Sequence, residues 1–84
     1  MVMELRTRVQ AEFRVVGKTV RIDFEGPTHG VTWASSNLAI ILEDLKGSGV
    51  VKWYRSNSSE FIVMPEWNWN PIELETEVKR RLQL

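Results

Sequence analysis

The chain has 84 residues, 11 acidic and 11 basic side chains, no cysteine and one histidine, His29. This length predicts one small domain, and the composition excludes disulfides, cysteine zinc sites and a histidine metal cluster within one chain. A formal net charge of zero argues against non-specific nucleic-acid binding, which relies on excess basic residues. We expect no cofactor and a cytoplasmic location, which the absence of cysteine permits.

The sequence predicts neither a signal peptide nor a membrane-spanning segment. Charges alternate at Glu4, Arg6 and Arg8, so the N-terminus does not resemble a signal peptide. The longest uncharged run, residues 26–42, is interrupted by Gly, Pro, Thr, Ser and Asn and is not expected to span a bilayer.

Residues 4–25 have the pattern of one long β-hairpin. The first strand alternates between one wet face and one apolar face, which carries Leu5, Thr7, Val9, Ala11, Phe13 and Val15. Gly17 and Lys18 suit a two-residue type II′ turn, because its first position needs a positive φ. The resulting register pairs Val15 with Val20, Phe13 with Ile22, and Ala11 with Phe24.

The same register places like charges opposite each other on the wet face. Arg14 lies opposite Arg21 and Glu12 opposite Asp23, which is unfavourable, although the diagonal pairs Arg14–Asp23 and Glu12–Arg21 can offset the cost. The apolar pairing outweighs this cost, so we keep the register. A complementary partner covering this face would explain the charges, and Arg14 and Arg21 are therefore candidate partner contacts.

A central helix is expected next. Its apolar stripe has the spacing of one helix face and consists of Leu38, Ile41, Leu42 and Leu45. Ser35 or Ser36 can cap its start, and residues 31–33 form a short strand or the arm leading into it. Gly47 or Gly49 ends it, because glycine adopts the left-handed conformation readily.

A second hairpin follows, with strands over residues 50–55 and 61–64 and a turn over residues 56–59. The expected pairs are Trp53 with Ile62 and Val51 with Met64 on one face, and Tyr54 with Phe61 on the other. Both faces carry large apolar side chains, which suggests cover on both sides.

The last helix has three agreeing start signals. Asn70 suits the N-cap, Pro71 the first helical position, and Glu73 the capping box. Trp69 and Leu74 are spaced as a hydrophobic staple. The apolar stripe is Leu74, Val78 and Leu82, and the i, i+4 ion pairs are Glu75–Lys79 and Glu77–Arg81.

The predicted fold class is therefore α+β, in the order ββαββα. We expect an antiparallel or mixed four-stranded sheet, a central helix packed on one face, and a C-terminal helix.

No catalytic residues are predicted. His29 with Ser35 and Ser36 lacks the spacing of a nucleophile system, and a loop histidine beside a helix cap is the simpler interpretation. Three acids, Glu12, Asp23 and Glu25, lie on one face of the hairpin and are interleaved with arginines. An open strand face offers no cleft that could give two carboxylates different roles in catalysis.

The leading functional hypothesis is a non-enzymatic protein-interaction or regulatory module, acting alone or as a homodimer. Trp67 and Trp69 are its candidate anchors, because tryptophan is enriched at interaction hot spots. The first strand can also pair with another subunit if its edge is free.

The alternative is a small nucleic-acid-binding protein that uses a basic and aromatic strand face. Its candidate residues are Lys46, Lys52, Tyr54 and Arg55. A second basic cluster at residues 79–81 also lies where a helix C-terminus favours cations.

Overall fold

A computed structural model of the chain describes residues 9–57 and 60–83. Its elements are β1 (Gln10–Val16), β2 (Thr19–Glu25), α2 (Thr28–Gly47), β3 (Val51–Asn57), β4 (Glu60–Pro65) and α3 (Pro71–Leu82). This is the predicted ββαββα order of an α+β domain.

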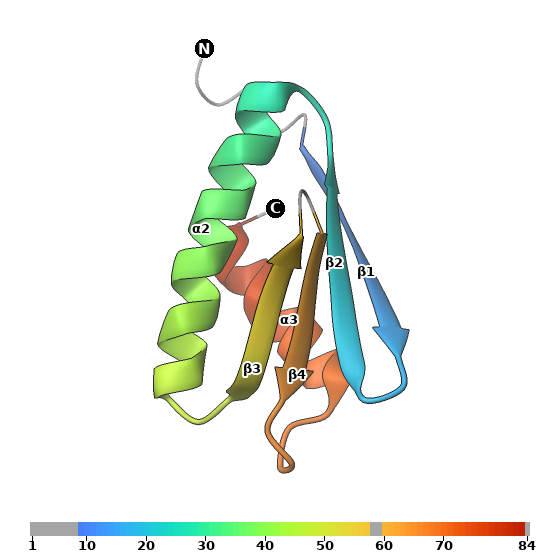
Figure 1. Cartoon of the computed structure of the whole chain (residues 1–84), viewed down its shortest axis with the longest axis vertical. Coiled ribbons are helices and arrows are strands. Elements are labelled where there is room, and N and C mark those ends of the chain that lie inside the picture. Colours follow the sequence, from blue (N-terminus) through green and yellow to red (C-terminus); the bar gives the residue numbers. More distant parts are fainter. Residues whose placement is uncertain (1–8, 58–59, 84) are drawn as a thin grey trace.

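The four strands form one antiparallel sheet in the order β1-β2-β4-β3 (Figure 1). β2 and β4 are central, and β1 and β3 are the edges. Figure 1 shows α3 crossing behind the sheet and α2 running beside the β3 edge. The antiparallel form of the prediction is confirmed, and the mixed form is excluded.

The first hairpin has the predicted register over its described residues. Val15 pairs with Val20, Phe13 with Ile22, and Ala11 with Phe24. Gly17 has a φ of 62° and Lys18 has no positive φ, as in a type II′ turn. The part of the predicted hairpin at residues 4–8 lies outside the described residues.

The core lies between one face of the sheet and the two helices. Strand alternation brings Val20, Ile22 and Val63 to this face, and each has no exposed surface. The helices contribute buried leucines and a valine, namely Leu38, Leu42, Leu45, Leu74, Val78 and Leu82. Burying one such side chain is worth about 1.5–3 kcal/mol, so this interface is the main source of stability.

The central helix begins earlier than predicted. α2 starts at Thr28, after Pro27 as N-cap residue, and the Val31 N–H donates to the Pro27 carbonyl at 2.9 Å. Residues 31–33 are therefore helical, and neither Ser35 nor Ser36 caps the start. The buried face of α2 continues from Leu38 back through Ala34 and Gly30. These two residues are small, so the apolar pattern of the sequence did not show the first turns of the helix.

Gly49 ends α2 in the predicted left-handed conformation. Its φ is 79°, its N–H donates to the Lys46 carbonyl at 3.3 Å, and the Val50 N–H donates to the Leu45 carbonyl at 2.9 Å. These two bonds form a Schellman motif, and the buried side chains of Leu45 and Val50 accompany it. Gly47 is the last helical residue.

The second hairpin differs from the predicted pairing. Trp53 pairs with Met64 and Tyr54 with Val63, and a bulge lies between Val51 and Trp53. The extra residue at this bulge breaks the period-two alternation, so Val51 is buried in the core instead of sharing the Trp53 face.

α3 begins as predicted. The Asn70 side chain accepts from the Glu73 N–H at 2.8 Å, and the Asn70 N–H donates to the Glu73 carboxylate at 3.1 Å. Pro71 occupies the first turn. Leu74 is buried and Trp69 is partly buried against the core, in the positions of a hydrophobic staple.

Replacing the cap tests whether this local geometry stabilises the protein. We expect Asn70→Ala to lower the free energy of unfolding by about 1 kcal/mol, since one N–H of the first turn loses its acceptor. Asn68→Ala removes an exposed amide two residues earlier and should cost less than about 0.5 kcal/mol. Urea denaturation of both variants measures the difference, and equal midpoints would contradict the role of the cap.

Candidate functional site

The second face of the sheet is not covered by any helix or strand that the structure describes. Alternation along the strands places the following residues there: Arg14, Arg21, Trp53, Arg55, Glu60, Ile62 and Met64. All are at least partly exposed. Trp53, Ile62 and Met64 thus give this open face an apolar part on β3 and β4. Its charges lie on β1, on β2, at the start of β4 and, with Arg55, on β3.

The two arginines that lie opposite each other in the first hairpin, Arg14 and Arg21, are close to a carboxylate of β4. Arg14 donates to Asp23 at 3.3 Å, as predicted for the diagonal, and its guanidinium also lies 3.5 Å from the Glu60 carboxylate. Arg21 approaches the same carboxylate at 3.9 Å. Glu60 therefore lies between the two arginines and offsets their repulsion without a partner.

This ion-pair network changes the argument for Arg14 and Arg21 as partner contacts. Both side chains lie on the open face and remain reachable, but the charge pattern no longer requires an external partner. The sequence analysis did not identify Glu60 as a neighbour of these arginines. Its position follows only from the pairing of β2 with β4, which places Glu60 next to Asp23.

The candidate nucleic-acid residues do not share one surface. Tyr54 lies on the helix side of the sheet, where its hydroxyl donates to the Glu43 carboxylate of α2 at 2.6 Å. Arg55 lies on the open face, 5.0 Å from the centre of the Trp53 ring. Lys52 occupies the bulge and Lys46 the last turn of α2. The aromatic ring beside Arg55 is thus Trp53 and not Tyr54.

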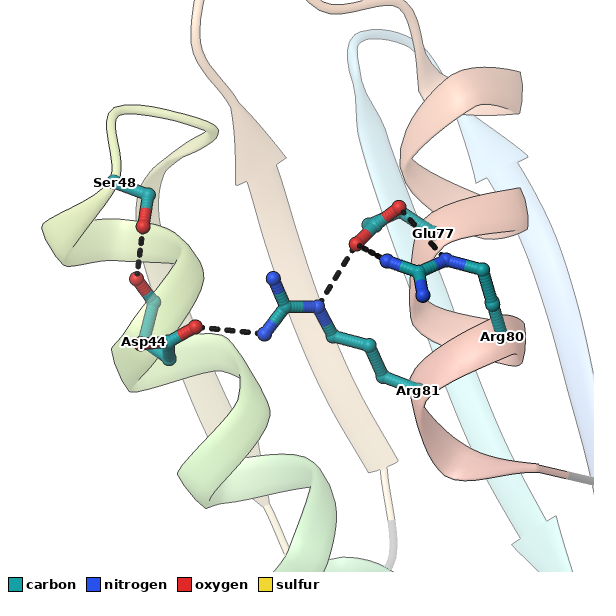
Figure 2. Close-up of polar contacts among 5 residues, drawn as sticks. All are labelled: Asp44, Ser48, Glu77, Arg80 and Arg81. Atoms are coloured by element: carbon teal, nitrogen blue, oxygen red, sulfur yellow. Dashed lines mark hydrogen bonds and ion pairs between the residues drawn. The ribbon is translucent and has the colours of Figure 1, made fainter.

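The basic cluster of α3 is largely neutralised within the chain. Figure 2 shows Arg81 reaching from α3 to Asp44 of α2 at 2.7 Å, while its Nε donates to Glu77 at 2.8 Å. Arg80 donates to Glu77 at 2.6 Å. Lys79 bonds Glu75 at 2.8 Å, so both predicted i, i+4 pairs form.

These contacts shift the pKa values of Glu77 and Arg81. Hydrogen bonds from Arg81 and Arg80 hold the pKa of the Glu77 carboxyl below its ordinary value. The bonds to Glu77 and Asp44 raise the pKa of Arg81. Both groups stay charged around neutral pH, and the network joins the two helices.

Trp67 is the most exposed large apolar side chain among the described residues, with 93% of its surface accessible. It lies in the connection between β4 and α3, at the rim of a hollow of about 480 Å³. Trp69, Met64 and Pro71 contribute apolar lining to this hollow. Of the two candidate anchors, Trp67 is thus free for a partner and Trp69 is partly used by the core.

The Trp67 segment is held by backbone hydrogen bonds on both sides. The Glu66 N–H donates to the Val50 carbonyl at 2.9 Å, and the Trp69 N–H donates to the Glu66 carbonyl at 2.9 Å. The capping box at Asn70 follows immediately. Trp67 is therefore held on a fixed turn, and a side chain on such a turn has less conformational entropy to lose in a contact with another molecule.

Two lysines lie at the same hollow. Lys18 of the first hairpin turn and Lys52 of the β3 bulge both line it, as does Glu66. Both lysines are exposed, and neither forms an ion pair with a residue in the described part of the chain. Sequence reasoning missed Lys18, because only the folded sheet brings the hairpin turn to the β4–α3 connection.

His29 lies in the first turn of α2 and not in a loop as expected, and it is exposed. Within residues 9–57 and 60–83, no three His, Asp or Glu side chains form a group suited to a metal ion. Neither described helix combines the length and the apolar character needed to cross a membrane.

Comparison of the chain with protein-family models, with curated proteins and with solved structures finds no match.

The Tyr54–Glu43 bond can be tested by titration, because the chain has a single tyrosine. Glu43 raises the pKa of Tyr54 above its ordinary 10.0, first through the hydrogen bond. The stability from this bond is present below pH 10.0 and is lost as the pH rises through the raised pKa.

Tyrosinate absorbance against pH should therefore give a midpoint above 10.0, which Glu43→Gln moves back toward 10.0. Glu25→Gln, which removes an exposed carboxylate on β2, is the control and should leave the midpoint unchanged. Identical midpoints for all three proteins would contradict the contact.

Proposed function

We propose that this chain is a cytoplasmic, non-enzymatic protein-interaction module that binds its partner at the Trp67 hollow. The observation that carries the proposal is a tryptophan with 93% of its surface exposed on a hydrogen-bonded turn. Leaving so large an apolar side chain in water has no benefit for folding, whereas tryptophan at the edge of a pocket is a common binding hot spot.

The lining of the hollow indicates the chemistry of the partner. Met64, Trp69 and Pro71 accept an apolar side chain, and Trp67 covers it from the rim. Lys18 and Lys52 attract a carboxylate to the same place. A protein segment that carries an apolar residue next to an acidic one meets both demands.

Trp67→Ala separates this binding role from folding. The substitution should leave the urea midpoint within error, because the side chain buries almost nothing in the chain itself. It should weaken the partner complex about thirtyfold, the effect of losing a hot-spot tryptophan worth about 2 kcal/mol. Calorimetric titration of a purified partner measures this loss.

A capture experiment with a matched control variant identifies the partner before that titration. Ile72→Ala truncates another exposed apolar residue, 70% accessible, which does not line the hollow. Immobilised wild-type and Ile72→Ala chains should capture a protein that the Trp67→Ala chain does not. Retention of every captured protein by Trp67→Ala would contradict the proposal.

Nucleic-acid binding is the second candidate, and the Arg55–Trp53 contact favours it. An arginine stacked on a partly exposed ring, with Lys52 one residue away, resembles a base-stacking platform. The surrounding open face weakens this candidate, because Glu60 and Asp23 place negative charge beside Arg14 and Arg21.

Fluorescence anisotropy with labelled single-stranded DNA and RNA distinguishes the two candidates. The protein-interaction proposal predicts a flat titration at low salt. Salt-dependent binding that Arg55→Ala weakens and Trp67→Ala leaves unchanged would support the nucleic-acid function instead.

A further inference from the structure

β1 is an edge strand with a neighbouring strand on one side only among the described residues. It is seven residues long and regular, and its apolar Val15 is 49% exposed. The other edge, β3, carries the bulge at Lys52, which disrupts regular pairing. A regular edge with exposed valines is a template for another strand, so β1 is the edge that can be extended.

The hairpin turn determines which backbone groups of β1 are free. In a hairpin with a two-residue turn the flanking residues, Val16 and Thr19, form a hydrogen-bonded pair, and such pairs alternate along the strands. The N–H and C=O groups of Arg14 and Glu12 therefore point toward β2. Those of Ala11, Phe13 and Val15 point toward the free edge.

The β1 strand of a second copy can form hydrogen bonds with these groups by antiparallel pairing about a two-fold axis. Only a few registers of this pairing are possible, and each is centred on one residue of β1. Centring the pair on Glu12 places two glutamates opposite each other, and centring it on Arg14 does the same with two arginines, both of which are unfavourable. Centring it on Phe13 pairs Ala11 with Val15 of the second copy. In this register Glu12 faces Arg14 of the second copy, twice per dimer.

The apolar side of the same register is also complementary. Phe13 is partly buried at the edge of the core, with the Lys79 ammonium 5.0 Å from its ring centre. Beside it, Val9, Ala11 and Phe13 line a shallow hollow of about 400 Å³. Pairing brings the two Phe13 rings opposite each other and covers Val15, and aromatic cross-strand pairs are favourable.

We propose that two copies of this chain associate through antiparallel pairing of their β1 strands, centred on Phe13, into one eight-stranded sheet. The occupant of the edge is a second copy, because the charge sequence of β1 is complementary to itself in this register and repulsive in its neighbours. The dimer pairs the free edge of β1, whereas Trp67 lies on the connection between β4 and α3, so substitution of Trp67 tests the two proposals separately.

Charge exchange tests the register. Light scattering after size exclusion should give twice the 9.8 kDa chain mass for the wild type. Glu12→Arg should weaken the dimer tenfold or more, roughly the effect of turning two opposite-charge pairs into like-charge pairs. The variant should stay folded, since an arginine at position 12 lies opposite Asp23.

The double variant Glu12→Arg with Arg14→Glu restores complementarity and should dimerise as the wild type does. Within each chain it places an arginine opposite Asp23 and a glutamate opposite Arg21, but it removes the ion pairs of Arg14 with Asp23 and Glu60. Urea denaturation of the double variant therefore checks that it is folded before its mass is compared. Trp67→Ala should leave the dimer unchanged, which separates failure of this inference from failure of the proposed function.

Cross-linking provides a test that does not depend on charge, because the chain contains no cysteine. In the proposed register positions 12 and 14 of the two copies form a pair with Cα atoms about 4.5 Å apart, within reach of a disulfide. A mixture of Glu12→Cys and Arg14→Cys chains should form a mixed disulfide dimer under oxidation. Each variant alone should not, because its own cysteines lie about 7–8 Å apart.

A monomer at every concentration would overturn the inference. So would a dimer that Glu12→Arg does not weaken and that the cysteine mixture does not cross-link, because that dimer uses another surface. Weakening by the single exchange, recovery by the double exchange and cross-linking only in the mixture would establish the register.

Discussion

The structure depends on one constraint: within residues 9–57 and 60–83, the helices cover only one face of the sheet. Val20, Ile22 and Val63 are fully buried on that face, and α2 and α3 both pack there. Because this single interface supplies most of the apolar burial, the open face and the strand edges contribute little to stability.

The sequence predicted those elements whose signals are local. Period-two alternation and Gly17 determined the first register, and Asn70, Pro71 and Glu73 determined the start of α3. The start of α2 was missed, because Gly30 and Ala34 bury a helix face without large apolar side chains. The bulge before Trp53 was not predicted, because the alternation of apolar and polar residues does not show where a strand contains an additional residue.

The surfaces were harder to predict, because they combine residues that are distant in the chain. Glu60 neutralises Arg14 only through the pairing of β4 with β2, and Lys18 meets Trp67 only in the folded sheet. The spacing did identify Trp69 as the residue that turns inward. Exposure of Trp67 then followed from a turn whose hydrogen bonds leave its ring in water. Both association proposals rest on such surfaces, and only the one at the β1 edge names its partner, a second copy of the chain.

Residue-resolved amide hydrogen exchange tests that central claim most directly. In the dimer, the amides of Ala11, Phe13 and Val15 donate across the edge and should exchange as slowly as those of Glu12 and Arg14, which donate to β2. The slow exchange of the first set should disappear on dilution, whereas that of the second set should remain. Fast exchange at Ala11, Phe13 and Val15 at high concentration, beside slow exchange at Glu12 and Arg14, would contradict pairing at this edge.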